Sequence, residues 1–95
     1  MVVVTYDVDV TQAAGAKRLR KVAHICESMG VRVQNSVFEI LLDQTRFVQL
    51  KQQLRTVIDP SQDSVRFYLL GTHYERKIDS LGKPLRIQQD GDLIL

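Results

Sequence analysis

The opening segment, Met1 to Asp7, constrains the fold more than any other, because a run of β-branched residues stops there at a carboxylate. Val2 to Thr5 are stiff at χ1 and favour the pleated backbone of a strand. The run is apolar almost without alternation, which is typical of a strand covered on both faces. Functional groups in sheets packed with helices tend to lie where such strands end. Asp7 is therefore a candidate functional acid; the alternative is an acid that serves only a turn or the start of a helix.

The segment after this strand has the spacing of an amphipathic helix. The pattern predicts a helix over Gly15 to Gly30, with Gly30 as the left-handed residue that ends it. Its expected inward face consists of Leu19, Val22, Ala23, Cys26 and Met29. Cys26 is the only cysteine, so it forms no internal disulfide, and its place on this stripe indicates a small core residue. One cysteine and two distant histidines also exclude a metal site of the zinc-finger type.

The middle of the chain predicts two more strands and a second helix. The sequence of Val31 to Leu42 predicts two strands joined by a turn at residues 34–36. Asp43 is placed to cap a helix that runs to about Ile58. In residues 64–70, Val65, Phe67 and Leu69 alternate with Arg66 and Tyr68, which predicts a fourth strand. The resulting β-α-β-β-α-β order predicts the ferredoxin-like α+β fold, in which both helices cover one face of an antiparallel sheet.

The length of 95 residues allows one domain, 1–95, with a small core. Residues 72–91 are mostly polar, but the chain then ends in three large apolar residues, 93–95, which would fray unless they were held. We therefore expect a short extra C-terminal strand, and we expect the segment 72–95 to pack on the partner of a homodimer.

The sequence disfavours a membrane-spanning protein and a secreted protein. No apolar run approaches the ~20 residues that a membrane-spanning helix needs. The start lacks the basic leader and the cleavage site of a signal peptide, which favours a cytoplasmic protein without a membrane partner. The net charge of +2 says little about partners, but its distribution is uneven.

Four cations fall within the five residues Lys17 to Lys21. Such a run is often only a solvated helix face, yet clustered cations also bind phosphates. Tyr6 and Phe38 have rings that could stack on bases, although Phe38 lies in an apolar strand and suits the core or an interface better.

Three segments stand out together: Tyr6 to Val8 at the end of the first strand, the basic run Lys17 to Ala23, and Gly30 to Glu39. Their combination resembles the small universal CRISPR-associated adaptation protein family, also called CRISPR-associated endoribonucleases, the smaller partner of the CRISPR integrase. The resemblance covers the whole chain. It implies a ferredoxin-like homodimer in which Asp7 of each subunit faces its mate across the two-fold axis, and the pair binds a divalent metal, Mg²⁺ or alternatively Mn²⁺.

The resemblance also implies cleavage of single-stranded RNA or double-stranded DNA, and a bridge between two integrase dimers during spacer acquisition. Asp7 matches the catalytic and metal-binding acid of the family. By position, the residues that the family uses toward nucleic acid correspond to Tyr6, Arg18, Arg20, Lys21 and Arg32, with Phe38 as a supporting residue. Two copies of Asp7 make a plausible site, since like carboxylates repel each other unless a cation or a proton lies between them.

The other acids are weaker candidates for a catalytic role. Glu39 lies within an apolar strand, and Asp43 serves as a cap. The acids expected to be solvated in loops or in the tail are Asp59, Asp63, Asp79, Asp90 and Asp92. Three functions stay open: a metal-dependent nuclease of CRISPR spacer acquisition, a non-catalytic DNA-binding scaffold that bridges integrase dimers, and an unrelated ferredoxin-like module that recognises RNA or a small ligand.

Overall fold

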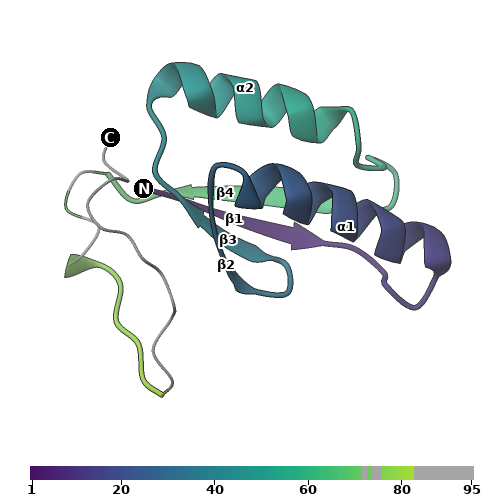
Figure 1. Ribbon diagram of the computed structural model, residues 1–95, viewed down its shortest axis with the longest axis horizontal. Helices are drawn as coiled ribbons and strands as arrows, with labels where there is room; N and C mark the ends of the chain where they lie inside the picture. Colours follow the sequence, from purple (N-terminus) through teal and green to yellow (C-terminus); the bar gives the residue numbers. More distant parts are fainter. Residues whose placement is uncertain (72, 74–75, 83–95) are drawn as a thin grey trace.

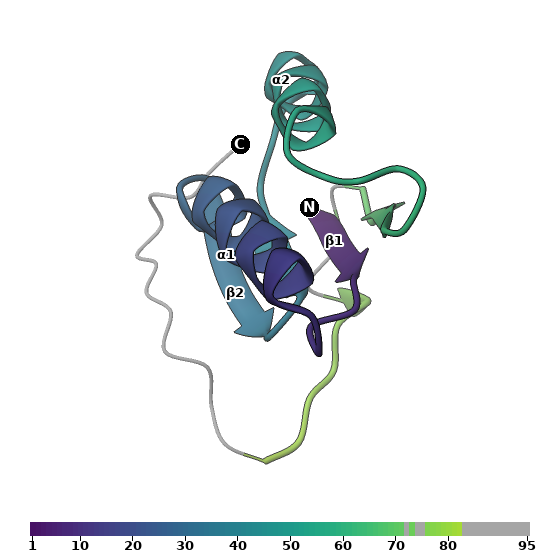
Figure 2. The same ribbon diagram turned by 90° about the vertical axis from the view of Figure 1, so that its right-hand side faces the viewer.

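Two helices lie over one face of a four-stranded sheet (Figures 1 and 2). The computed structural model describes residues 1–71, 73 and 76–82. The elements in chain order are β1 (Val2–Asp7), α1 (Ala13–Glu27), β2 (Gly30–Gln34), β3 (Val37–Ile40), α2 (Gln44–Arg55) and β4 (Ser64–Leu69). The predicted β-α-β-β-α-β order is confirmed. The predicted strand at 93–95 lies outside the described residues, and the packing of 72–95 on a partner stays a prediction.

The sheet has the strand order β2-β3-β1-β4, and every neighbouring pair is antiparallel. The first strand, β1, is therefore central: Val4 pairs with Phe38 of β3 on one side and with Phe67 of β4 on the other. This position explains the uninterrupted β-branched run, because a central strand is flanked by strands at both edges.

Side chains of β1 alternate between two different environments. Val2, Val4 and Tyr6 are buried under the helices. Val3 and Thr5 point to the opposite face and are half-buried, and no helix or strand among the described residues covers them. A cover on this second face, which the apolar run predicts, would have to come from outside the described part of the chain.

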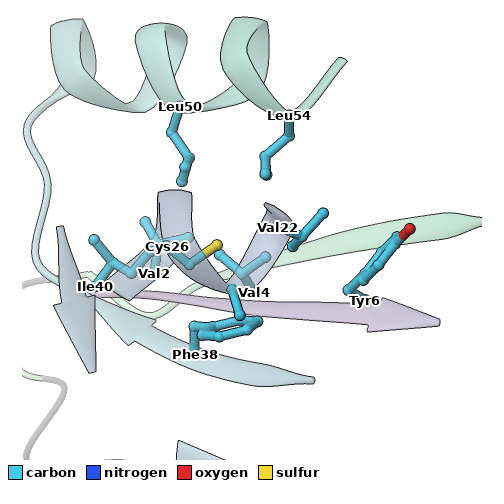
Figure 3. Packing of buried hydrophobic residues seen from close by; sticks show 10 residues of the cluster. Val2, Val4, Tyr6, Val22, Cys26, Phe38, Ile40, Leu50 and Leu54 are labelled. Carbon is cyan, nitrogen blue, oxygen red and sulfur yellow. The ribbon is translucent and has the colours of Figure 1, made fainter. Parts of the chain in front are cut away.

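The helices bury the faces that their spacing predicts. Val22, Ala23 and Cys26 of α1 are buried, and so are Leu50 and Leu54, which point from α2 toward the sheet (Figure 3). The Asp43 carboxylate accepts a hydrogen bond of 2.8 Å from the Arg46 N–H, which confirms the predicted cap. None of the helices in the described ranges is long and apolar enough to cross a membrane.

Gly30 does not end the first helix as predicted. α1 stops at Glu27, and Gly30 begins β2, where it pairs with Ile40. A side chain at this position would collide with the Glu39 carbonyl oxygen and with Ile40, so the glycine permits close approach of two strands. Positive φ angles occur at Gly71 and Gly82 among the described glycines. The second helix also ends earlier than predicted, at Arg55.

Candidate active site and nucleic-acid interface

Asp7 is the last residue of β1 and is exposed. It pairs in register with Ser64, the first residue of β4, and shares a face of the strand with Val3 and Thr5. Its carboxylate therefore belongs to the end of the central strand, on the side of the sheet away from the helices. Within the described residues, no three His, Cys, Asp or Glu side chains gather as a metal site would require. A single copy of the described chain thus offers no group of three such ligands around Asp7.

Tyr6 points the other way, into the core under the helices. Its side chain is only 2% exposed, and its ring extends along the edge of the apolar cluster (Figure 3). The hydroxyl donates a hydrogen bond of 2.5 Å to Oδ2 of Asp63. A buried ring has no free face on which a base could stack, so the structure argues against the predicted contact of Tyr6 with nucleic acid.

Asp63 is buried, and the prediction that it is solvated is wrong. Its carboxylate receives four hydrogen bonds. Oδ2 accepts from the Tyr6 hydroxyl, from Arg18 Nε at 2.8 Å and from the Asp59 N–H at 2.9 Å, while Oδ1 accepts from Arg18 Nη2 at 3.0 Å. A buried carboxylate is tolerated when its lone pairs are satisfied and a cation is paired with it, and both conditions are met here.

The proton affinities in this cluster follow from the contacts. Burial by itself would raise the pKa of Asp63, but the hydrogen bonds from Arg18, Asp59 and Tyr6 outweigh burial and lower it. Burial, followed by the hydrogen bond to the negatively charged Asp63, raises the pKa of Tyr6 to about 12. Tyr6 is therefore a neutral donor and Asp63 an ionised acceptor near neutral pH.

The basic run of α1 divides into two groups. Arg18 pairs with Asp63, and its side chain is only 18% exposed. Lys17, Arg20 and Lys21 are exposed on the surface of the helix. The predicted phosphate contact by Arg18 competes with this ion pair, whereas Arg20 and Lys21 stay available as the prediction requires.

Arg32 and Phe38 lie together, but only one of them is accessible. Phe38 is fully buried, which confirms its interpretation as a core residue. The guanidinium carbon of Arg32 lies 5.8 Å from the centroid of the Phe38 ring, and Arg32 Nε donates to the carbonyl of Asn35 at 2.8 Å. Arg32 is exposed, so part of its guanidinium faces solvent beside the β2–β3 turn.

The sheet face away from the helices carries mixed chemistry beside Asp7. Glu39 is half-buried and is paired with Val3, and Arg66 and Tyr68 are exposed on β4. A hydrogen bond to Tyr68 raises the pKa of Arg66. Charged and apolar side chains thus alternate across this face.

Sequence reasoning missed Asp63, although the fold contained a signal for it. Antiparallel pairing of β1 with β4 places the residue before β4 beside the end of β1, because Asp7 pairs with Ser64. Asp63 precedes Ser64 as Tyr6 precedes Asp7, so their side chains point to the same side of the sheet. The strand register, once known, identifies this contact.

A family model and individual relatives both match this chain to CRISPR-associated Cas2 proteins. A model of the family described as CRISPR associated protein Cas2 matches residues 1–78. The CRISPR-associated endoribonuclease Cas2 3 of Rhodospirillum rubrum is 46% identical over 95 residues, which is all of both chains. The CRISPR-associated endonuclease Cas2 of Halalkalibacterium halodurans is 45% identical over 94 residues, 99% of this chain and 98% of the relative.

A solved structure is similar as well. The crystal structure of Streptococcus pyogenes Cas2 superposes with a TM-score of 0.80 at 51% sequence identity, over 85% of this chain and 98% of that one. The likeness therefore extends from the sequence to the arrangement of the helices and the sheet.

Proposed function

The chain belongs to the CRISPR-associated Cas2 family, and we propose that it is an endonuclease of CRISPR spacer acquisition that cleaves phosphodiester bonds. The relatives described above are named as an endoribonuclease and an endonuclease, so we propose single-stranded RNA and double-stranded DNA as the two substrate classes to test. The structural observation that carries the proposal is the exposed Asp7 at the end of the central strand.

The donor set at Asp7 suits one half of a magnesium site. Hydrolysis of a phosphodiester requires activation of water and stabilisation of the negative phosphate, and bound Mg²⁺ supplies both. Mg²⁺ is usually held by one or two carboxylates while it keeps several waters and contacts substrate phosphates. We propose that Asp7 from each of two subunits supplies these carboxylates, with Mn²⁺ as an alternative ion. The Asp7 carboxylate, free of an intramolecular ion pair among the described residues, fits the role of a ligand.

Homodimerisation is part of this proposal. Two features support it: the sheet face with Val3 and Thr5, which no described helix or strand covers, and the small core of a short chain. The larger CRISPR integrase is proposed as a further partner because of family membership. A non-catalytic scaffold that bridges integrase dimers is not favoured, since the relatives are named as nucleases. The cytoplasmic localisation stays a prediction.

For nucleic acid, we propose that Arg20, Lys21 and the solvent-facing part of Arg32 contact phosphates. The support is their exposure and their chemistry: the guanidinium fork of arginine and the ammonium of lysine both bind phosphate oxygens, whatever the base sequence. Tyr6 and Phe38 would act indirectly, through the core that carries β1 and β3.

Cleavage of labelled single-stranded RNA and double-stranded DNA, with Mg²⁺, with Mn²⁺ and with chelator, tests the proposal. Asp7→Asn keeps the shape of the side chain but removes its charge, so it should fold normally and lose cleavage by at least ~100-fold, a barrier increase of about 2.7 kcal/mol. The matched control is Asp43→Asn, because asparagine caps helices about as well as aspartate.

The outcomes separate the candidate functions. If Asp7→Asn cuts as fast as the wild type, Asp7 is not catalytic. If neither protein cuts either substrate with Mg²⁺ or Mn²⁺, the scaffold function takes over.

A further inference from the structure

The strongest unassigned feature is the buried cluster directly behind the candidate acid. Tyr6 and Asp63 are the residues that immediately precede the paired residues Asp7 and Ser64. The side chains of Tyr6 and Asp63 meet on the helix side of the sheet, and Arg18 joins them from α1. We call Tyr6, Asp63 and Arg18 the Asp63 cluster.

We propose that Asp63 is a positioning residue for Asp7, because the Asp63 cluster fixes the end of β1 and with it the direction in which the Asp7 carboxylate emerges. The inference rests on the proposed nuclease function, since it concerns the same site. Asp63 lies on the opposite side of the sheet from the proposed site, so it acts through the backbone and not on the substrate.

The end of β1 needs such an anchor. Terminal rungs of a ladder fray, and Asp7 and Ser64 form the last β1–β4 pair. The backbone N–H of Tyr6 donates to the Ser36 carbonyl at 2.9 Å, which ties the strand toward the β2–β3 turn. The Tyr6 hydroxyl ties the same residue to Asp63 on the β4 side. Tyr6 is thus held on both sides, by the residue before β3 and by the residue before β4, one position before the acid.

Asp63 is itself rigidly placed. The planar guanidinium of Arg18 contacts both carboxylate oxygens, which fixes the plane of the carboxylate. The hydrogen bond from the Asp59 N–H holds the same carboxylate against the backbone of the loop before β4. A functional carboxylate must be held within about 0.5 Å of its productive geometry, and side chains locked by packing and hydrogen bonds provide this precision. Asp63, with four donors, is an anchor of this kind.

A purely structural role would not require these residues. Buried ion pairs are weak contributors to stability, and well-packed apolar residues of similar volume often serve as well or better. The choice of a buried carboxylate beside the exposed one therefore indicates that a defined direction of the strand end matters more than stability alone.

The test separates positioning from stability by referring the exchange of residues 5–8 in each variant to the exchange of the buried core residues Val4 and Val22, which reports the loss of overall stability. Asp63→Asn keeps the size of the side chain but weakens the contact with Arg18, and Tyr6→Phe removes only the hydroxyl anchor. The control Asp43→Ala removes the α2 cap, which lowers stability with no contact to Asp7. For each variant, NMR measures the hydrogen-exchange rates of residues 5–8. Electron paramagnetic resonance measures Mn²⁺ affinity in a titration without nucleic acid. Cleavage assays give kcat and KM.

Relative to these core residues, we expect hydrogen exchange over residues 5–8 to become at least ~10-fold faster in Asp63→Asn and Tyr6→Phe than in Asp43→Ala. Mn²⁺ binding should weaken by ~10-fold, and kcat should fall by ~10-fold or more with KM nearly unchanged. The reason is that the acid is misdirected while the phosphate-binding residues stay in place.

Equal exchange and equal Mn²⁺ affinity in Asp63→Asn and Asp43→Ala would overturn the inference. If Asp63→Asn fails to fold, Tyr6→Phe decides by the same measurements. Hydrogen exchange reports on the strand end whether or not the wild type cleaves nucleic acid, so failure of the proposed function is recognised separately.

Discussion

The Arg18 guanidinium holds the Asp63 carboxylate at two points, Nε to Oδ2 at 2.8 Å and Nη2 to Oδ1 at 3.0 Å, across 45 residues of sequence. This pair joins the first helix to the loop before β4. It also removes Arg18 from the cations of the run Lys17 to Lys21 that were predicted to contact nucleic acid. The residues of one short basic segment therefore have different tasks, and variants can distinguish them.

The exposed cations of α1 should account for the phosphate contacts of the helix. The double variant Arg20→Ala/Lys21→Ala should flatten the slope of log K against log salt by about 1.8 for two lost contacts with duplex DNA. Arg18→Ala should leave this slope nearly unchanged, because its guanidinium is bound to Asp63. Filter-binding at several salt concentrations measures both. A slope change in Arg18→Ala equal to that of one exposed cation would show that Arg18 reaches phosphate.

Loss of the Asp63 carboxylate should destabilise the fold strongly. Asp63→Ala leaves the Tyr6 hydroxyl and Arg18 without their acceptor, and we expect a loss of about 3 kcal/mol, the lower end for a broken buried pair, because Arg18 is partly exposed. Tyr6→Phe removes one hydrogen bond to a charged group and should cost about 2 kcal/mol. Urea unfolding measures both, with Asp79→Ala as an exposed control acid. A loss below about 1 kcal/mol in Asp63→Ala would contradict the role of the cluster.

The same carboxylate predicts a pH dependence of stability. Although burial opposes it, hydrogen bonding from Arg18 holds the pKa of Asp63 below its ordinary value in the folded protein. The stabilisation is then fully present above the pKa of unfolded aspartate, about 3.9, and is lost as the pH falls from there through the lower folded pKa. The stability advantage of the wild type over Asp63→Asn should shrink in this acidic window and stay constant above about pH 5. Urea unfolding of both proteins between about pH 2 and 7 checks it. An advantage that grows on acidification would mean that the folded pKa is raised.

Gly15 should resist the usual stabilising exchange to alanine. In most helices Gly→Ala gains about 1 kcal/mol. Here an added Cβ would collide with the Asp9 carbonyl, which the loop before α1 brings over the first turn of the helix. Gly15→Ala should therefore lower the melting temperature. Calorimetry compares it with Gly82→Ala, which meets no neighbouring atom but carries the strain of a positive φ. A higher melting temperature in Gly15→Ala would show that the loop can move away.

Local patterns were sufficient to predict the order of the elements. The inward residues of α1 repeat with the helical period, and β1 is a run of β-branched residues, so both follow from the neighbours of each residue in sequence. The cap at Asp43 and the burial of Cys26 follow for the same reason, and both are confirmed.

What sequence reasoning missed depends on pairing between distant segments. Asp63 lies in a polar loop, and its burial arises because β4 pairs with β1 and because Arg18 of α1 packs against it. Gly30 has the sequence of a helix end, yet the close approach of β3 determines its conformation. The Tyr6 ring was expected to stack on bases, but the alternation of β1 points it to the opposite side of the sheet from Asp7. Each error reflects a contact that no local window contains.

The long separation between Tyr6 and Asp63, 57 residues, has a consequence for how the protein folds. A contact of this range can form only after most of the chain has collapsed, since closing so large a loop costs entropy before any contact is gained. We therefore expect the strand end with Asp7 to become ordered last. Variants at Asp63 should then chiefly accelerate unfolding and leave the folding rate nearly unchanged. Under this order of events, a nascent or partly unfolded chain has no formed acid site, and the capacity to cut appears only with the completed fold.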